Sequence, residues 1–158
     1  MITKRLADML TAQISSEVKA HQMYMGIGLY FRRQSLDEWG KLFQKQSMEE
    51  AQHAKKIIDF LIDVEVEFDL PGNAGASTHY ASALEACKAA LSSEQRVSEE
   101  FQAMAVAATD EKDFRVFQFL QWFIEEQVEE ESKMQKIIDL VESGVNLFQA
   151  QPLLSEFE

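Results

Sequence analysis

Several features are scarce in this 158-residue sequence, and each scarcity argues against a class of protein. Cys87 is the only cysteine, so no internal disulfide can form and nothing points to secretion. Only two prolines and six glycines interrupt the chain, which favours long helices. No run approaches the roughly 18 apolar residues of a membrane span, and the first residues lack the apolar core of a signal peptide. We therefore expect a cytoplasmic protein.

Basic residues are also in the minority. Fifteen Lys and Arg residues face 27 Asp and Glu residues, which gives a net charge of −12. Proteins that bind nucleic acids or anionic membranes normally present a basic face, so we expect neither as a partner. The carboxylate surplus is compatible with attracting cations. A hydrophobic share of 46% and a charged share of 27% are typical of a globular chain, and we expect one domain over residues 1–158.

The apolar residues recur with helical periodicity in four long segments. These segments cover approximately residues 4–33, 36–64, 82–109 and 113–143. Ser35 and Ser82 are the expected N-caps of the second and third helices, each with a glutamate three residues later, and Gly144 is suited to end the fourth. A short fifth helix is expected at 145–157. The sequence therefore predicts an all-α protein.

The connections between these helices predict how they are arranged. The first and third connections are tight, so each joins two helices as an antiparallel hairpin. The second covers residues 65–81 and contains Pro71, Gly72 and Gly75. Fully extended, it reaches about 56 Å, whereas a 28-residue helix is about 42 Å long. It can therefore run back along the whole molecule, which predicts a four-helix bundle with one long crossover.

In each predicted helix, residues at alternating steps of three and four should face the interior, and we call this row the inward stripe. Each inward stripe is mostly apolar but is interrupted by polar residues. The two hairpin turns are centred near residues 34 and 111, and each interruption lies 16 to 19 residues from its turn. At 1.5 Å per residue, all of them lie roughly 25 Å from a hairpin end. No Lys or Arg falls on the stripes as written. One level of the bundle should therefore collect six polar side chains: Glu17, Glu50, His53, Glu94, Gln127 and Glu130.

The energetics of burial indicate what such a layer is for. A single glutamate on a stripe is more often solvated than buried, but four at matched heights are hard to attribute to chance. Burying an unpaired carboxylate costs several kcal/mol, and carboxylates that face one another repel and raise each other's pKa. Polyvalent cations relieve this cost better than protons do. Mostly oxygen donors with one imidazole suit iron or manganese, with zinc able to compete, and four carboxylates match two divalent ions.

The chain resembles the haem-free prokaryotic ferritins over essentially its whole length. The residues that carry the resemblance are Glu17 with Tyr24 one heptad later, "EEAQH" around Glu50, "SSEQ" around Glu94 and "FLQWFIEEQVEEE" around Glu130. The resemblance implies a subunit of a hollow shell of 24 chains. Such a shell takes Fe(II) and O₂ as substrates, oxidises the iron and stores Fe(III) as mineral.

The resemblance also implies roles for individual residues. One iron position uses Glu17, Glu50 and His53. The other uses Glu94, Glu130 and the bridging Glu50, with Gln127 beside it as a hydrogen-bonding partner. A third, outlying iron position matches Glu49, Glu126 and Glu129 together with Glu130. Tyr24 matches a tyrosine that supplies an electron, and Trp122 is a weaker candidate for that role.

Two relatives are disfavoured by what the sequence lacks. Bacterioferritins and rubrerythrins carry a second Glu-x-x-His, whereas Lys133 stands three residues after Glu130 here. Bacterioferritins also place a haem-binding methionine where this chain has Ala51, so we expect no haem. The segment after Gly144 is short and lacks the sequence pattern usual for the fifth helix of prokaryotic ferritins. A shell of 24 subunits and a smaller oligomer therefore both stay open.

Three functions remain in competition at this point. The first is iron storage with ferroxidase activity, and the sequence leaves storage and iron detoxification equally open. The second is a di-metal carboxylate oxidase that acts on an organic substrate. Bulky Phe101, Phe123 and Tyr24 on the stripes argue against the substrate pocket that such an oxidase needs. The third is an acidic helical scaffold without catalytic activity.

Overall fold

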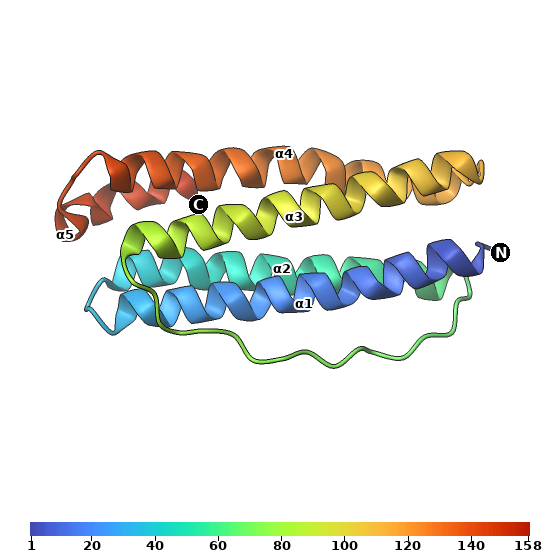
Figure 1. The fold of residues 1–158 in the computed structure, drawn as a ribbon, viewed down its shortest axis with the longest axis horizontal. Helices are drawn as coiled ribbons and strands as arrows, with labels where there is room; N and C mark the ends of the chain where they lie inside the picture. Colours follow the sequence, from blue (N-terminus) through green and yellow to red (C-terminus); the bar gives the residue numbers. More distant parts are fainter.

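The computed structural model describes all 158 residues and contains helices but no strands (Figure 1). The elements are α1 (Lys4–Arg32), α2 (Asp37–Asp63), α3 (Ala83–Asp110), α4 (Phe114–Glu142), α5 (Leu147–Ala150) and a 3₁₀ helix (Gln151–Phe157). The predicted all-α fold is confirmed, and the four long helices begin and end within one residue of every predicted limit. The expected fifth helix is a single α-turn followed by 3₁₀ helix.

The arrangement of the helices follows from their connections (Figure 1). Helices α1 and α2 lie side by side and run in opposite directions, as do α3 and α4. The segment between α2 and α3 runs along the length of the bundle, so these two helices run in the same direction. The predicted long crossover is therefore confirmed. No helix is both long enough and apolar enough to cross a membrane.

The crossover is held against α1 along its course. A Cβ atom at Gly26 would collide with the carbonyl oxygen of Ser77, so only glycine lets the two backbones approach this closely. The hydroxyl of Ser15 donates to Asn73 Oδ1 at 2.9 Å, and Arg33 Nη1 donates to the carbonyl oxygen of Thr78 at 3.2 Å. These contacts fix the crossover to the outer side of the first hairpin.

The turn between α1 and α2 differs from the prediction. Ser35 was expected to cap α2, but its φ of 60° lies in the left-handed region and the N-cap is Leu36, which makes no side-chain hydrogen bond. The amides of Ser35 and Leu36 instead bond back to the carbonyls of Arg32 and Phe31. This Schellman pattern ends α1, and a residue that ends one helix in this conformation cannot also cap the next.

The other two predicted helix ends agree with the structure. The side chain of Ser82 accepts a hydrogen bond from the amide of Glu85, as expected for the N-cap of α3. Gly144 follows α4 with a φ of 79°, the conformation that glycine adopts at no steric cost. Both ends are determined by local sequence, which explains why they were predictable.

Two apolar clusters fill the bundle, one towards each end. The cluster near the N-terminus includes Leu10, Ile57 and Phe123, and the cluster near α5 includes Phe43 and Ile137. Burial of these side chains is the main stabilising contribution, at about 25 cal/mol per Å² of apolar surface. Polar side chains occupy the middle of the bundle, between the two clusters.

The inward stripe of α3 lies partly on other residues than predicted. Alternating steps of three and four residues from Glu94 predict that Leu91, Ser98 and Ala105 face inward, but these residues are only half-buried. The buried positions at these levels are one residue earlier: Ala90, Val97 and Met104. Small and apolar residues occur on both sides of this helix, so hydrophobicity alone does not determine its rotation. Glu94 is common to both phases and is buried.

The C-terminal segment folds back against the start of α2. Trp39 Nε1 donates to the carbonyl oxygen of Leu147 at 2.9 Å, and Gln151 Oε1 accepts from the amide of Glu38 at 2.9 Å. Ala150 and Leu154 are buried in the cluster at this end.

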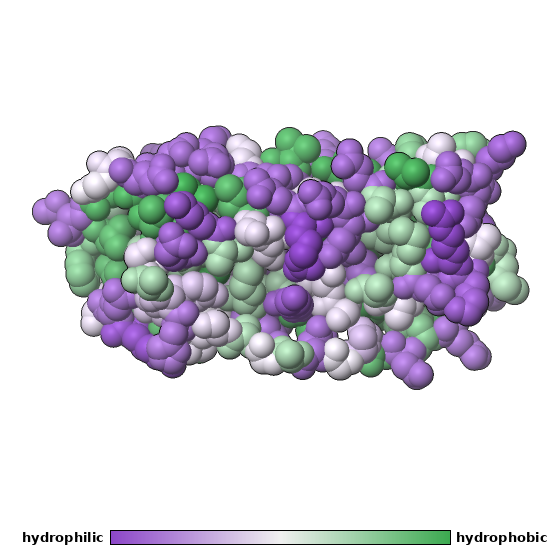
Figure 2. Space-filling view, in the orientation of Figure 1, coloured by the Kyte–Doolittle hydropathy of each residue, from purple (hydrophilic) through white to green (hydrophobic).

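The face in Figure 2 is mostly hydrophilic, and hydrophobic residues gather at the end that carries α5.

Candidate metal centre

A layer of buried polar side chains separates the two apolar clusters. All four long helices contribute, and each of these side chains is at most 5% exposed. The layer consists of Gln13, Glu17, Gln46, Ser47, Glu50, His53, Glu94, Gln127 and Glu130. All six side chains expected at one height therefore lie in this layer. The equal spacing of the interruptions from the two hairpin turns accounts for their convergence.

Two groups of three potential metal ligands form within this layer. In each group, one donor atom per residue lies within 4.8 Å of the others. The histidine triad is Glu17, Glu50 and His53, and the carboxylate triad is Glu50, Glu94 and Glu130. Glu50 belongs to both, so the two triads adjoin and can hold two ions that share one carboxylate.

The histidine triad belongs to the first hairpin alone. His53 lies three residues after Glu50 on α2, and its Nδ1 is 3.1 Å from Glu50 Oε2 and 3.6 Å from Glu17 Oε2. Burial alone would lower the pKa of His53, but the facing carboxylates of Glu17 and Glu50 raise it to about 11. In the metal-free protein, the imidazolium therefore offsets the charge of these carboxylates.

Glu17 is only partly satisfied by its neighbours. Its Oε1 accepts a hydrogen bond from Gln13 Nε2 at 3.2 Å, whereas its Oε2 is buried without a hydrogen-bond partner. A buried acceptor without a partner costs about 1 to 3 kcal/mol. A cation placed between Glu17, Glu50 and His53 would supply the missing partner, so this triad fits a bound metal ion.

The carboxylate triad joins the two hairpins. The hydroxyl of Tyr24 donates to Glu94 Oε1 at 2.6 Å, and Gln127 Nε2 donates to Glu94 Oε2 at 3.0 Å. Gln46 Nε2 donates to Glu130 Oε2 at 2.7 Å and to Glu50 Oε1 at 3.1 Å. The oxygens are thus held by neutral donors, and no imidazole belongs to this triad.

Burial and mutual repulsion make these carboxyl groups weak acids. Burial, followed by the charge of Glu50, raises the pKa of Glu94 to about 8. Burial and the charge of Glu94 raise the pKa of Glu130 to about 8, although Lys133 works in the opposite direction. Burial likewise raises the pKa of Tyr24 well above its ordinary value, so this phenol stays protonated. A divalent ion would take the place of the protons on the two carboxyls.

Lys133 is the neighbour of the centre that the sequence analysis missed. No cation was expected on the inward stripes, yet half-buried Lys133 donates through Nζ to Gln46 Oε1 at 2.7 Å. Position 133 lies one helical turn after Glu130, so the two residues share a face of α4. This spacing is visible in the sequence, where Lys133 stands in the position of a second histidine ligand.

The residues expected at an outlying iron position line a separate hollow. Half-buried Glu49 and Glu126 and exposed Glu129 lie around it together with Glu130. The two compact triads contain none of the first three residues. Lys133, Lys136 and two glutamates of the C-terminal segment line the same hollow. The structure thus brings the predicted residues to one hollow without drawing them into a tight cluster.

Trp122 lies between the surface and the histidine triad. Its ring packs edge-on against His53 with centroids 5.4 Å apart, and Lys56 Nζ lies 3.5 Å from the ring centroid. Glu49 and Glu126 line the same small hollow. A cation over an indole ring stabilises the neutral ring relative to its oxidised, positively charged form. This contact weakens the case for Trp122 as an electron donor.

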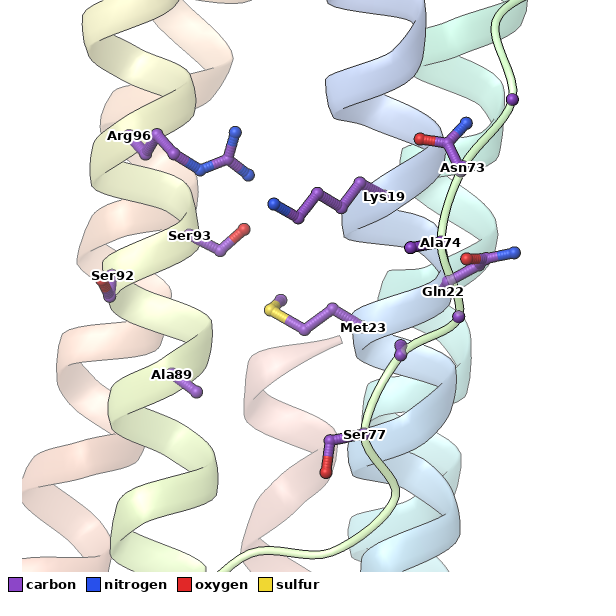
Figure 3. Close-up of a pocket in the computed structure, with 13 residues that line it drawn as sticks. Lys19, Gln22, Met23, Asn73, Ala74, Ser77, Ala89, Ser92, Ser93 and Arg96 are labelled. Atoms are coloured by element: carbon purple, nitrogen blue, oxygen red, sulfur yellow. The ribbon is translucent and has the colours of Figure 1, made fainter.

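A groove of different character lies on the outer side, between α1, α3 and the crossover (Figure 3). Lys19 and Arg96 extend towards one another across it, with Ser93 and Met23 nearby. No Asp, Glu or His lines this groove, and no residue predicted for the metal centre belongs to it. It is therefore not a second cation site.

Residues 7–143 match the family described as Ferritin-like domain. The chain belongs to the ferritin family. Ferritin BfrB from Mycolicibacterium smegmatis is 34% identical over 144 residues, which cover 90% of this chain and 80% of that protein. Bacterial non-heme ferritin from Staphylococcus epidermidis is 33% identical over 139 residues, which cover 88% and 84% of the two chains. The predicted membership of the bacterial-type ferritins is confirmed.

Solved ferritin structures share the whole fold. A Humanized Archaeal ferritin superposes with a TM-score of 0.93 at 27% identity and covers 98% of each chain. An open pore ferritin from Archaeoglobus fulgidus gives a TM-score of 0.93 at 26% identity, covering 99% of this chain and 97% of that one. The ferritin fold and the carboxylate and histidine groups of this chain are together consistent with iron binding and storage.

Proposed function

We propose that this ferritin oxidises Fe(II) with O₂ at the two adjoining triads and stores the resulting Fe(III) as mineral inside a hollow homo-oligomer of 24 subunits. The observation that carries the proposal is the sharing of Glu50. It places a histidine triad and a carboxylate triad side by side in a buried layer. Two ions held in this way can each give one electron to the same O₂ molecule.

The donor set favours the reaction in a definite direction. Five donor residues, one histidine and four glutamates, supply mostly oxygen ligands, which stabilise Fe(III) over Fe(II). Two Fe(II) lose one electron each, and O₂ takes up both electrons with two protons to give H₂O₂. The metal ligands are proposed to be Glu17, Glu50 and His53 for one iron, and Glu50, Glu94 and Glu130 for the other. Gln127 orients Glu94 through the hydrogen bond described above.

Tyr24 is placed to assist this step. It is fully buried and its hydroxyl donates to Glu94 Oε1 at 2.6 Å. A phenol that gives up an electron must also lose its proton, and the adjacent carboxylate can accept that proton. We propose that, when a third Fe(II) also takes part, Tyr24 supplies the fourth electron in this way, so that O₂ takes up four electrons and four protons and gives two molecules of water.

A path for the product follows from the hollow beside Glu130. Glu49, Glu126 and Glu129 surround it and offer only oxygen donors. We propose that they bind a third, outlying iron and pass Fe(III) from the centre towards the storage cavity. One histidine holds the ions less firmly than two would, which favours release. Blocked turnover after the first two equivalents of iron per chain would contradict this release step.

The absence of haem and the cytoplasmic location belong to the same proposal. Ala51 has no atom that can bind a haem iron, and Lys133 replaces a second histidine ligand. A similar protein from Mycobacterium tuberculosis, 32% identical, carries the name Bacterioferritin BfrB. The names of relatives therefore do not decide the question. An absorption spectrum of protein purified from cells supplied with haem precursor tests it, and a Soret band would contradict the proposal.

The oxidation and the assembly can be tested separately. Aerobic Fe(II) added to the metal-free protein should produce Fe(III) absorbance faster than in buffer. Glu94→Ala should abolish the fast phase and leave the circular dichroism spectrum unchanged. Diffraction from crystals soaked anaerobically in Fe(II) should show anomalous signal at both triads at the iron edge. Ions that bind only at the surface would contradict the assigned site.

Light scattering coupled to gel filtration tests the assembly. A shell of 24 chains of 18.1 kDa has a mass of several hundred kDa, well separated from that of a dimer. A smaller oligomer with fast iron oxidation would favour detoxification without a storage cavity. A monomer with no oxidation would favour a helical scaffold.

A further inference from the structure

Gln46 connects two carboxyl groups of the carboxylate triad. Its side chain is 1% exposed, and its Nε2 donates to Glu50 Oε1 at 3.1 Å and to Glu130 Oε2 at 2.7 Å. Both hydrogens of one amide group are therefore directed at carboxyls that come from different hairpins. The amide fixes the separation and orientation of the two groups.

Lys133 determines which way the amide of Gln46 points. Its Nζ donates to Gln46 Oε1 at 2.7 Å. An ammonium group has no acceptor, so it bonds only to the oxygen of the amide and leaves the nitrogen directed at Glu50 and Glu130. If the amide turned over, its NH₂ group would face the ammonium and its oxygen would face the carboxylates. The chain Lys133–Gln46–Glu50/Glu130 is consistent in one orientation only.

We propose that Lys133 and Gln46 form a positioning pair that prepares the carboxylate triad for a divalent ion. This inference rests on the proposed function, because it assumes that the triad binds Fe(II). Each carboxylate oxygen has two lone pairs, so it can accept from Gln46 and still bind a metal. Outer-shell partners of this kind typically contribute a factor of 10 to 100 in metal affinity. Lys133 is a positioning residue, because its hydrogen bond goes to Gln46 and not to a proposed metal ligand.

Because Lys133 is positively charged, the direction in which its removal changes the metal affinity tests the proposal. A cation beside a metal site repels the incoming ion, so a lysine with only an electrostatic effect would weaken binding. Its removal would then strengthen binding. A lysine that orients Gln46 has the opposite signature, because its removal weakens binding. Lys136 supplies a matched control: it lines the same hollow one turn later and is exposed, but the hydrogen bond to Gln46 Oε1 comes from Lys133.

The experiment is an anaerobic titration of the assembled, metal-free protein with cobalt(II) chloride, followed by calorimetry and visible absorption. Glu94→Ala identifies the binding step that belongs to the carboxylate triad, because that step should disappear. Lys133→Met should weaken the same step by about 10-fold or more. Lys136→Met should leave it unchanged or slightly strengthened. Circular dichroism and light scattering show that each variant folds and assembles.

Changes at Gln46 test whether Lys133 acts through this residue. Gln46→Leu should weaken the same step to a similar extent, and adding Lys133→Met should have little further effect, since the two residues act in series. Lys133→Arg keeps a donor for Gln46 Oε1 and should restore most of the affinity. A merely structural role would not produce this pattern.

The outcomes separate this inference from the proposed function. Two-ion binding by the wild-type chain with equal or tighter binding by Lys133→Met would overturn the positioning pair alone. An equal loss in Lys136→Met, or no loss in Gln46→Leu, would also overturn it. A wild-type chain that binds no cobalt(II) in the buried layer would overturn both proposals.

Discussion

The histidine triad and the carboxylate triad share Glu50 but neutralise their charge in different ways. The histidine triad comes from one hairpin and contains its own counter-charge, because the facing carboxylates raise the pKa of His53 to about 11. The carboxylate triad spans both hairpins and contains no side chain that could carry a positive charge. Its charge is reduced by protons on Glu94 and Glu130, whose pKa values are each about 8.

This difference shows that one metal-free layer can store protons in two places. With pKa values of about 11 and about 8, His53 carries protons on both ring nitrogens at pH 7, while the carboxyls of Glu94 and Glu130 are mostly protonated. A metal ion must displace protons from either triad. The histidine triad is organised by its own ion pair, whereas the carboxylate triad depends on Tyr24 and the two glutamines for orientation.

The largest expected effect comes from removing the residue that both triads share. Glu50→Ala should abolish paired binding of cobalt(II), with a loss greater than the roughly 100-fold that an outer-shell partner contributes. Anaerobic calorimetry measures this loss. Glu67→Ala removes one exposed glutamate of the crossover and should bind two ions as the wild type does. If Glu50→Ala retained two tight sites, the triads would be independent and the comparison would fail.

The next effect concerns the displaced protons. Binding of two divalent ions at pH 7 should release about three protons per chain, one each from His53, Glu94 and Glu130, the triad residues whose pKa is raised to about 8 or higher. Calorimetry in two buffers of different ionisation enthalpy gives this number. Glu94→Gln removes one of the three acidic protons, and a release near zero in the wild type would contradict the protonated layer.

A smaller effect is expected on the metal-free fold. His53, Glu94 and Glu130 all have pKa values in the folded state above those of the unfolded chain. Their protons therefore stabilise the fold below the unfolded pKa, and this contribution is lost as pH rises through the folded pKa. From pH 6 to pH 8, in the presence of a chelator, the free energy of unfolding should fall by at least about 1 kcal/mol.

Denaturant titrations at the two pH values measure this change. Glu94→Gln should lower the pH dependence, because an amide does not titrate. Saturating cobalt(II) should reverse it, since the metal replaces the protons and binds more tightly at higher pH. Stability that rises from pH 6 to pH 8 in metal-free protein would show that the carboxyls are ionised already.

Much of the centre was predictable because helical geometry converts spacing into height. Glu17, Glu50 and Glu94 could be placed at one level from the positions of two turns alone. The length of the crossover likewise determined which helices run parallel. Local patterns were sufficient at Ser82 and Gly144, where the cap depends on one residue and its neighbours.

The parts that were wrong or missed depend on contacts between elements. Ser35 ends α1, and its backbone bonds to that helix, so it does not cap α2. The rotation of α3 is decided by its neighbours, because apolar residues flank both Leu91 and Ala90. Lys133 reaches the layer from outside the stripe because its side chain is long and flexible. A stripe drawn from Cβ positions does not include such a residue.

The smallest effect distinguishes two roles of Tyr24, the residue that donates a hydrogen bond to the carboxylate triad. Tyr24→Phe removes the hydrogen bond to Glu94 Oε1 but keeps the ring that stacks on Phe43, with centroids 6.1 Å apart. Loss of that bond should cost about 1 kcal/mol in the metal-free protein and leave two-ion binding nearly intact. Tyr30→Phe, on the same helix but outside the layer, should change neither.

If Tyr24 also supplies an electron, a second difference must appear when iron is oxidised. Wild-type protein frozen during the reaction should then show a tyrosyl radical by electron paramagnetic resonance, and Tyr24→Phe should lose that signal while Tyr30→Phe keeps it. Unchanged spectra in Tyr24→Phe, together with the expected loss of stability, would assign Tyr24 to the support of Glu94 alone. In that case the carboxylate triad would differ from the histidine triad only in how its charge is neutralised, and every electron taken by O₂ would come from iron.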